Sequence, residues 1–173
     1  MTNTGTTLYS KVRPLWQIVL LYITTCGLYF FYWFYKNSEF IYADQPTAVK
    51  PQWRTLGLLV PLLNLYLIWK LFDDIQKRVT QAGVRSFGNP LSLTILFLLC
   101  SALYRLDKLY SFLGFLSVVP VVLMQKKLNH YWQRKQPGLP QRNKLYWQEI
   151  LICVIGGILL VFAVIGAGLP PQT

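Results

Sequence analysis

The sequence is poor in charged residues, and this shortage excludes most classes of soluble protein. Only 13% of its 173 residues are Asp, Glu, Lys or Arg, about half of the roughly 25% that soluble domains contain. Hydrophobic residues make up 54% of the chain, and they fall in long blocks rather than in the short alternating patterns of a soluble core. These blocks predict an all-α membrane protein.

Residues suited to metal or redox chemistry are also scarce. The chain has one histidine, His130, and three cysteines, Cys26, Cys100 and Cys153, which lie far apart within apolar stretches. This spacing gives no basis for a disulfide framework or a zinc site. No metalloprotease, P-loop or nucleophile-elbow motif appears in the sequence. We therefore expect neither an enzyme nor a cofactor.

Five apolar blocks predict a polytopic membrane helix bundle with about five transmembrane helices, in a single domain over residues 1–173. The first block, residues 15–35, has 21 residues without a charge, enough to cross about 30 Å of hydrocarbon. The other blocks cover residues 53–69 (or 55–69), 90–104, 109–124 and 146–169. The third and fourth are short and closely joined, so they form either two full crossings or a re-entrant hairpin.

The distribution of Lys and Arg predicts the orientation in the membrane. The net charge is +11, and five crossings with the N-terminus inside place twelve Lys and Arg on the inner side and five on the outer side. Cytoplasmic loops carry such an excess, so the N-terminus is expected inside and the C-terminus outside. The same rule explains the positive charge without a nucleic-acid partner.

A basic cytoplasmic loop is expected over residues 126–145. Anionic lipid headgroups attract such cations at about 1 kcal/mol each, and an acidic cytoplasmic partner is the alternative. The six cations are Lys126, Lys127, Arg134, Lys135, Arg142 and Lys144.

Two helices are expected to extend from the membrane into the cytoplasm, over residues 70–83 and 125–137. The first keeps its apolar residues at helical spacing and is expected to end at Gly83, a typical C-cap residue. In this extension acidic residues precede basic residues by four positions, the order that favours ion pairs along a helix: Asp73 before Lys77, and Asp74 before Arg78.

Several short motifs follow one another between residues 15 and 129. They are Thr25-x-Gly27-x-Tyr29, Tyr32-Trp33, Pro61-x-x-Asn64-x-Tyr66 with Phe72 beyond, and Gln125-x-x-Leu128-Asn129. In this order they resemble small prokaryotic membrane proteins grouped as domain-of-unknown-function family 4234. The resemblance implies a core of four helices over residues 15–129 and a bacterial source, in the inner (cytoplasmic) or a thylakoid membrane. It implies no activity, and the helix over residues 146–169 is appended to this core.

Polar and small residues within the first two blocks form a candidate intramembrane site. Thr24, Thr25 and Gly27 lie near the middle of the first block, and Pro61 and Asn64 lie in the second. Pro61 removes a helix hydrogen bond and predicts a kink. Asn64 is expected to bond across helices to one of the two threonines. The structural interpretation is an interhelical clamp, and the functional one is a polar group beside a solute path.

The last block contains small residues where another helix can approach closely. These residues are Gly156, Gly157, Ala163 and Ala167. The approaching helix belongs either to this chain, to a second copy in a homo-oligomer, or to another membrane protein.

Together these features predict a non-enzymatic interaction protein, such as a structural or assembly subunit of a larger membrane complex. The alternative is a small oligomeric channel or transporter for ions or neutral solutes, with Asn64, Thr24 and Thr25 near the path. Because the blocks hold no charge deep inside, this alternative favours neutral solutes over proton coupling.

Overall fold

The computed structural model is helical, with no strand among the residues that it describes, which are 11–44, 49–84, 88–106, 108–140, 144–145 and 147–168. The all-α prediction is therefore confirmed for this part of the chain. The elements, with η for 3₁₀ helices, are α1 (Leu15–Thr24), α2 (Tyr29–Asp44), α3 (Pro51–Leu56), η1 (Gly57–Leu59), α4 (Pro61–Gln81), α5 (Pro90–Ala102), η2 (Leu103–Arg105), η3 (Lys108–Ser117), α6 (Val118–Lys135) and α7 (Trp147–Gly168).

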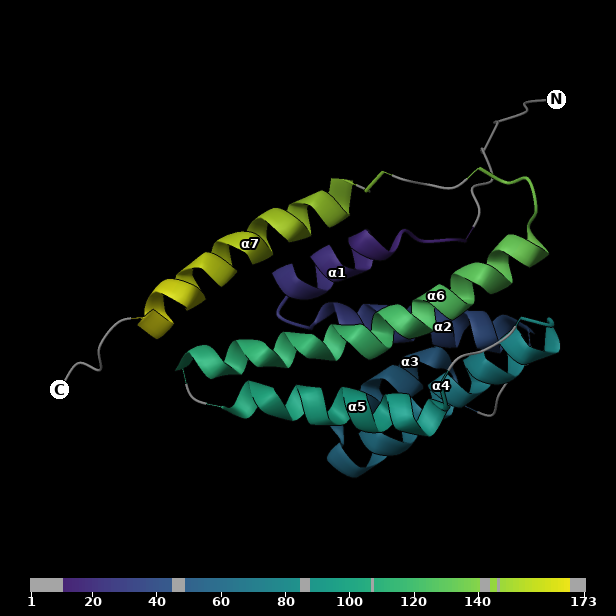
Figure 1. Cartoon of the computed structure of the whole chain (residues 1–173), viewed down its shortest axis with the longest axis horizontal. Coiled ribbons are helices and arrows are strands. Elements are labelled where there is room, and N and C mark those ends of the chain that lie inside the picture. Colours follow the sequence, from purple (N-terminus) through teal and green to yellow (C-terminus); the bar gives the residue numbers. More distant parts are fainter. Residues whose placement is uncertain are drawn as a thin grey trace.

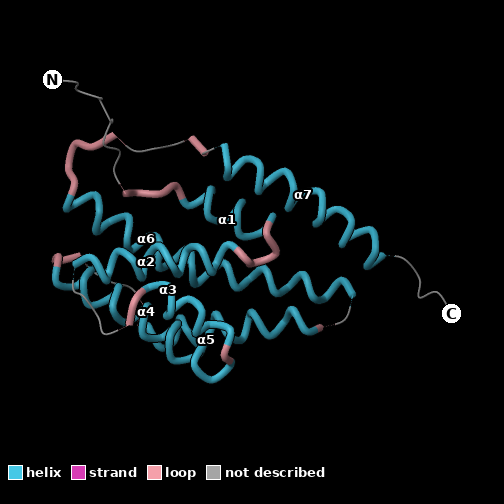
Figure 2. The backbone as a smooth tube through the Cα atoms, turned by 180° about the vertical axis from the view of Figure 1, so that it is seen from behind, coloured by secondary structure: helices cyan, strands magenta, loops and turns pink. Residues whose placement is uncertain are grey.

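The first apolar block does not form one helix. The chain reverses over residues 25–28, between α1 and α2 (Figure 1, Figure 2). The amides of Cys26 and Gly27 donate to the carbonyls of Ile23 (3.0 Å) and Tyr22 (2.8 Å), and both residues have positive φ, 50° and 86°. This pair of hydrogen bonds is a Schellman motif, which closes a helix. The prediction of a single crossing over residues 15–35 is therefore wrong.

The second block also reverses, at Val60. This residue is extended, with φ −92° and ψ 115°, and Pro61 is the first residue of α4. A proline disfavours the helical conformation of the residue before it, and it suits the first turn of a helix because that turn needs no N–H partner. Arg54 in α3 lies 3.5 Å from Asp74 in α4, so the two helices lie side by side as the arms of a hairpin. The predicted kink at Pro61 is therefore a reversal.

The remaining predicted helices are present. α5 and η3 pack as the two arms of a hairpin, and the fourth block continues through α6 to Lys135. The extension of α4 ends at Gly83, which has φ 71°. There the amides of Gly83 and Val84 donate to the carbonyls of Thr80 and Val79, as expected for a C-cap. The described residues within 15–129 thus form six α-helices instead of four, because each of the first two blocks is divided.

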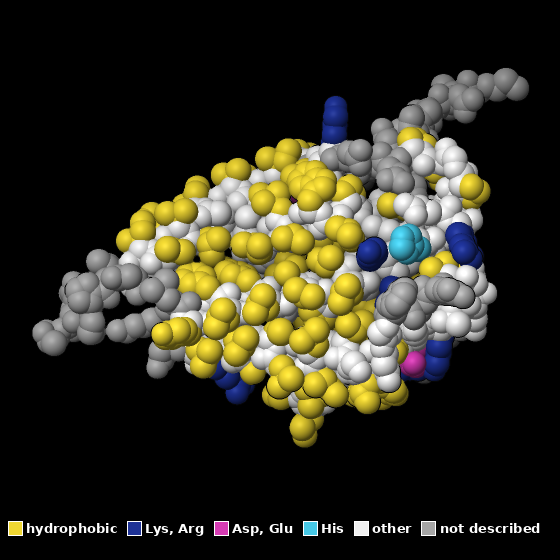
Figure 3. All heavy atoms as spheres, viewed as in Figure 1, with side chains coloured by type: hydrophobic (Ala, Val, Ile, Leu, Met, Phe, Trp, Pro, Cys, Tyr) yellow, Lys and Arg dark blue, Asp and Glu magenta, His cyan; other side chains and the backbone are white. Residues whose placement is uncertain are grey.

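Most charged segments gather at one end of the bundle, which we call the polar end. There α1, α3, α5 and α7 begin, and α2, α4 and α6 end (Figure 1). On the face shown in Figure 3, most Lys and Arg side chains lie toward this end, and hydrophobic atoms dominate the rest. Among the described side chains, Arg105 is the one Lys or Arg at the opposite turn, after α5. The predicted split of twelve to five assumed that residues 36–54 lie opposite the N-terminal segment, and the two reversals remove that assumption.

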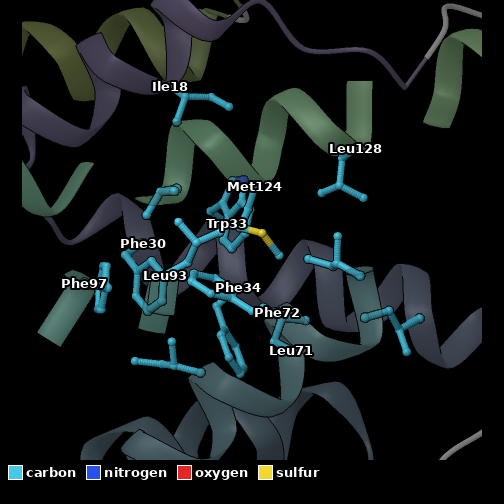
Figure 4. Packing of buried hydrophobic residues seen from close by; sticks show 14 of the residues in the cluster. Ile18, Phe30, Trp33, Phe34, Leu71, Phe72, Leu93, Phe97, Met124 and Leu128 are labelled. Carbon is cyan, nitrogen blue, oxygen red and sulfur yellow. The ribbon is translucent and has the colours of Figure 1, made fainter. Parts of the chain in front are cut away.

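The hydrophobic core surrounds α2, which lies between α4, α5 and α6 (Figure 4). Phe34 of α2, Phe72 of α4 and Met124 of α6 are fully buried, and burial of each such side chain contributes about 1.5–3 kcal/mol. Phe30 of α2 lies 4.4 Å from Phe97 of α5, between ring centroids. The hairpin formed by α1 and α2, the first hairpin, thus contributes to the core.

Among the described residues, two helices are long and apolar enough to cross a membrane, by length and composition. One is Tyr110–Lys135, with 26 residues, and the other is Glu149–Gly166, with 18. In its most apolar stretch, 44% of the first helix is buried within the bundle, whereas in the second helix Gly156 alone is buried. Residues Leu15–Thr24 and Pro90–Arg105 form shorter apolar helices.

Candidate functional site

The contact of α7 with α1 shows where the turn at residues 25–28 lies along the length of α7. A Cβ atom added to Gly156 would lie 2.8 Å from the carbonyl carbon of Thr24 and closer still to its oxygen. Near the start of α1, Arg13 lies 3.6 Å from the carboxylate of Glu149. From Glu149 to Gly156, α7 rises about 11 Å at 1.5 Å per residue. The turn after α1 therefore lies beside the middle of α7.

The small residues of the last block occupy different environments. Gly156 is buried against α1, whereas a Cβ added to Gly157 would have no neighbour within 4 Å. Ala163 is exposed, and the side chain of Ala167 lies outside the described residues. The exposed face of α7 at Gly157 forms a shallow apolar groove, the α7 groove, lined by Cys153, Val154, Gly157, Ile158, Val161 and Phe162.

The predicted hydrogen bond between Asn64 and Thr24 or Thr25 is wrong. Each threonine hydroxyl donates to the carbonyl four residues before it, at 2.9 Å for Thr24 and 2.7 Å for Thr25. The Thr25 hydroxyl also accepts from the amide of Tyr29 at 2.9 Å. Both hydroxyls are therefore used by the local backbone, where they help to end α1 and begin α2.

Asn64 and Gly27 instead line one cavity, which we call the turn cavity. Its volume is about 230 Å³. It lies where the turn between α1 and α2 meets the turn between α3 and α4 and the last turns of α5. Its walls are mostly apolar, and the residues that form them are Tyr22, Cys26, Gly27, Leu28, Phe30, Phe31, Leu58, Asn64, Ile68, Phe97, Leu98, Ser101 and Tyr104.

Two polar atoms of the turn cavity are buried without a hydrogen-bond partner in the described part of the chain. They are Oδ1 of Asn64 and the hydroxyl oxygen of Tyr104. By contrast, the hydroxyl of Tyr22, on the same wall, lies 2.7 Å from that of Ser117. Ser117 in turn donates to the carbonyl of Gly114 at 2.5 Å. A third such atom, the hydroxyl oxygen of Ser38 in α2, lies outside the cavity. An unsatisfied buried polar atom costs about 1–3 kcal/mol, so each of these atoms lowers stability.

A second polar cluster lies near the polar end and joins the segment before α1 to α2 and α6. Asn129 donates to the carbonyl of Arg13 at 2.6 Å and accepts from its amide at 3.1 Å. Gln125 donates to Asn129 at 2.9 Å and accepts from the indole of Trp33 at 2.7 Å. The guanidinium of Arg13 donates to the hydroxyl of Tyr29 at 3.0 Å. The cluster is a satisfied network that fixes the entry of α1.

The charge of Arg13 is stabilised in this cluster. Burial alone would lower the pKa of its guanidinium, but Tyr29, Tyr32 and Glu149 raise that pKa above its ordinary value. Reasoning from single residues did not identify this cluster. The sequence feature that could have revealed it is the set of motifs that resemble the membrane family. Four residues of those motifs meet in this cluster: Tyr29, Trp33, Gln125 and Asn129.

The cations expected to contact lipid headgroups differ in their exposure. Residues 126–135 belong to α6 rather than to a loop. Lys127 is buried and donates to Gln76 at 2.7 Å and to the carbonyl of Gly88 at 3.2 Å, so its assignment to the headgroups is wrong. Arg142 lies outside the described residues. Four of the six cations are exposed: Lys126, Arg134, Lys135 and Lys144.

The ion pairs expected on α4 are formed in part. Lys77 lies 2.6 Å from Asp73, and this hydrogen bond raises the pKa of Lys77. Asp74 contacts Lys70 at 3.1 Å and the buried Arg54 at 3.5 Å. Arg78 donates to the carbonyl of Ile41 at 3.3 Å. Asp74 therefore joins α3 to α4 rather than only supporting its own helix.

Comparison with known proteins finds no match among models of protein families, among curated proteins or among solved structures. The resemblance to family 4234 therefore stays a prediction from the motifs alone.

Proposed function

We propose that this chain is a non-enzymatic integral membrane protein that acts as an accessory or assembly subunit, with α7 as the helix that binds its partner. The observation that supports this proposal is the exposure of α7. Within Glu149–Gly166 every residue except Gly156 is exposed or half-buried, and α7 contacts mainly α1 and η3. The α7 groove lacks polar side chains, and Gly157 leaves space there for the close approach of another helix.

The partner that we propose is another membrane protein with an apolar transmembrane helix and an acidic cytoplasmic segment. Charge favours it over a second copy of this chain. The exposed cations Lys126, Arg134, Lys135 and Lys144 belong to α6 and to the segment that leads into α7. Two copies joined through α7 would bring these like charges together, whereas an acidic segment would neutralise them.

We propose three crossings in place of five, formed by α5, η3 with α6, and α7. The hairpins α1–α2 and α3–α4 would enter from the cytoplasmic side and return to it. This arrangement keeps the N-terminus inside and the C-terminus outside, and it leaves almost all Lys and Arg on the inner side, in accord with the positive-inside rule. The location would be a bacterial inner membrane or a thylakoid membrane, with anionic headgroups at the polar end.

Photo-crosslinking from α7 tests the partner proposal. A photoreactive amino acid replaces Val161, in the α7 groove, and in a matched control it replaces Leu159, which is exposed on another side of the helix. We expect one heterologous membrane protein to be crosslinked from position 161 and much less from position 159. Equal crosslinking from both positions, or crosslinks to lipid alone, would contradict docking at the groove. A dimer of this chain as the main product would replace the heterologous partner by a second copy.

The second candidate function is transport of a neutral solute. It is favoured by the turn cavity, because two chain reversals meet around it, and broken helices around a cavity are the arrangement of many transporters. Flux of neutral solutes through the purified chain in liposomes, lost on Asn64→Leu, would support it. Liposomes without flux would leave the accessory function as the proposal.

A further inference from the structure

The hairpin formed by α3 and α4, the second hairpin, has an apolar tip that the described part of the chain leaves uncovered. In its turn Leu59 is 70% exposed, and at the start of α4 Leu62 is 83% exposed. Large hydrophobic residues on both arms are exposed as well: Trp53, Leu56, Leu63, Leu65 and Tyr66. An exposed apolar surface of this kind contacts a protein or a membrane. Because it extends over the turn and both arms, acyl chains, which can surround a tip, suit it better than a partner with one contact face.

The apolar tip ends where charged residues begin on the same helix. From Pro61 to Trp69, α4 rises about 12 Å at about 1.5 Å per residue. Lys70 follows and lies 3.1 Å from Asp74. A tryptophan followed by a lysine is typical of a membrane interface. The apolar length is less than half of the roughly 30 Å of hydrocarbon in a bilayer, so the tip reaches into one leaflet.

The first hairpin reaches a similar depth. Its first arm, α1, covers Leu15–Thr24 and rises about 14 Å. The turn that follows lies beside the middle of α7. In Figure 1 and Figure 2, α5, α6 and α7 reach the end of the bundle opposite the polar end, whereas both hairpins stop short of it. Both hairpins therefore occupy only the leaflet next to the polar end.

The described helices consequently fill the two leaflets unequally. The seven α-helices all pass through the leaflet next to the polar end, whereas the opposite leaflet holds the end of α5, η3 with the start of α6, and α7. A helix about 10 Å wide occupies about 80 Å² of the membrane plane, so the four additional helices displace about 300 Å² of lipid from one leaflet. A protein that is wider in one leaflet fits best where that leaflet is expanded, which is the convex side of a curved membrane.

We propose that the two hairpins form a wedge, through which the chain favours membranes that are convex toward the cytoplasmic side. The apolar tip of the second hairpin is covered by the acyl chains of the cytoplasmic leaflet. This inference rests on the three crossings proposed above, and it does not depend on the partner of the α7 groove.

Partition of the unchanged full chain between a giant vesicle and a narrow tube pulled from it tests the proposal. The vesicle contains phosphatidylcholine and phosphatidylglycerol, and its outer leaflet becomes the convex one in the tube. A fluorophore at the N-terminus and a membrane-impermeant quencher added outside distinguish chains that have the polar end outside from chains in the opposite orientation.

We expect chains with the polar end outside to be at least about twofold denser in the tube than in the vesicle, a preference of about 0.4 kcal/mol. Chains in the opposite orientation should be depleted from the tube, because their wider part lies in the compressed leaflet. Equal densities for the two orientations, enrichment of both, or the reverse order would overturn the proposal.

A pair of variants assigns the effect to the second hairpin. Leu62→Lys places a charge at the apolar tip, which costs about 2.5–3.5 kcal/mol within hydrocarbon, so this hairpin should leave the leaflet. Gln52→Lys is the matched control, because it adds the same charge to the same hairpin at an exposed position near the polar end. We expect the free energy of partition to fall by about half in Leu62→Lys, since two of the four additional helices leave the leaflet, and to be unchanged in Gln52→Lys. Equal partition of the two variants would refute the role of the second hairpin.

Failure of the wedge can be told from failure of the three crossings. Val49→Cys places a thiol between the two hairpins, on the inner side with three crossings and on the outer side with five. Labelling from the inner side, together with partition that does not depend on orientation, would overturn the wedge alone. Labelling from the outer side would remove the three crossings and the wedge with them.

Discussion

Replacement of Gly156 by alanine tests the packing of α7 against the rest of the chain. An added Cβ would meet the backbone of Thr24, at 2.8 Å from its carbonyl carbon and 3.4 Å from its Cβ. Real Cβ contacts essentially never fall below 3.0 Å, and a backbone carbonyl has no rotamer by which to move aside. The neighbouring glycine offers a matched control, because a Cβ on Gly157 would meet nothing within 4 Å.

The magnitude follows from the difference between the two alanine variants. Both exchange Gly for Ala within the same helix, so both gain the same helix propensity, about 1 kcal/mol. Only Gly156→Ala adds the cost of overpacking, typically about 1–3 kcal/mol. We therefore expect Gly156→Ala to destabilise the contact of α7 with α1 by this amount relative to Gly157→Ala. In the ratio of docked to undocked helix, the lower limit corresponds to about a fivefold change.

A disulfide between α1 and α7 provides the assay. The hydroxyl of Thr24 lies 3.8 Å from the sulfur of Cys153, so Thr24→Cys places a second thiol next to the native one. Cys26 and Cys100 are replaced by serine in this background. We measure the initial rate of disulfide formation at limiting oxidant, since this rate reports how often the two helices are in contact.

We expect the rate in Gly157→Ala to equal that of the parent and the rate in Gly156→Ala to fall at least fivefold. Equal rates in the two variants would show that α7 does not pack on α1 through Gly156. In that case the depth assigned to the turn at residues 25–28 would lose its basis as well.

Three further predictions concern the polar end. Asn129→Ala removes three hydrogen bonds and should lower the free energy of unfolding by about 2–4 kcal/mol. The control is Gln133→Ala at an exposed position, which should lower it by less than about 0.5 kcal/mol. Both are measured by denaturation in detergent. Asp74→Ala leaves its buried arginine partner unpaired and should cost about 3–5 kcal/mol, whereas Asp73→Ala should cost less than about 1 kcal/mol; similar losses would contradict the burial of this pair. Val49→Cys should react with a membrane-impermeant thiol reagent only in inside-out vesicles, because the re-entrant hairpins keep it inside. Reaction only in right-side-out vesicles would restore five crossings.

The sequence predicted where helices occur better than it predicted where they stop. The helix after Trp147 and the extension of α4 to Gly83 follow from uninterrupted periodicity and a typical C-cap, and both are present. One continuous helix over residues 15–35 was predicted from the absence of charge alone. A Schellman turn needs no charge, and here a cysteine takes the left-handed position that glycine usually occupies.

The candidate site was predicted in composition but not in contacts. Asn64 and Gly27 were identified and line the same cavity, whereas Tyr104, which also lines it, was not. A tyrosine near the end of an apolar block is typical of a membrane interface, so the sequence gives it a simpler explanation. Its place in the same cavity as Asn64 depends on the two chain reversals, which bring three separate segments together, and no local pattern encodes that arrangement.

The backbone hydrogen bonds of the two turns bear on the re-entrant hairpins proposed above. Irregular backbone within a bilayer is tolerated only where its polar groups are satisfied inside the protein or line a cavity. In the first turn, the amides of Cys26, Gly27 and Leu28 all donate to nearby carbonyls. In the second, Val60 donates to the carbonyl of Gly57 at 3.1 Å, and Pro61 has no N–H to satisfy. These amides are therefore satisfied within the turns themselves. Both turns can thus lie inside a bilayer, as the re-entrant hairpins proposed above require, without an outside partner for their N–H groups.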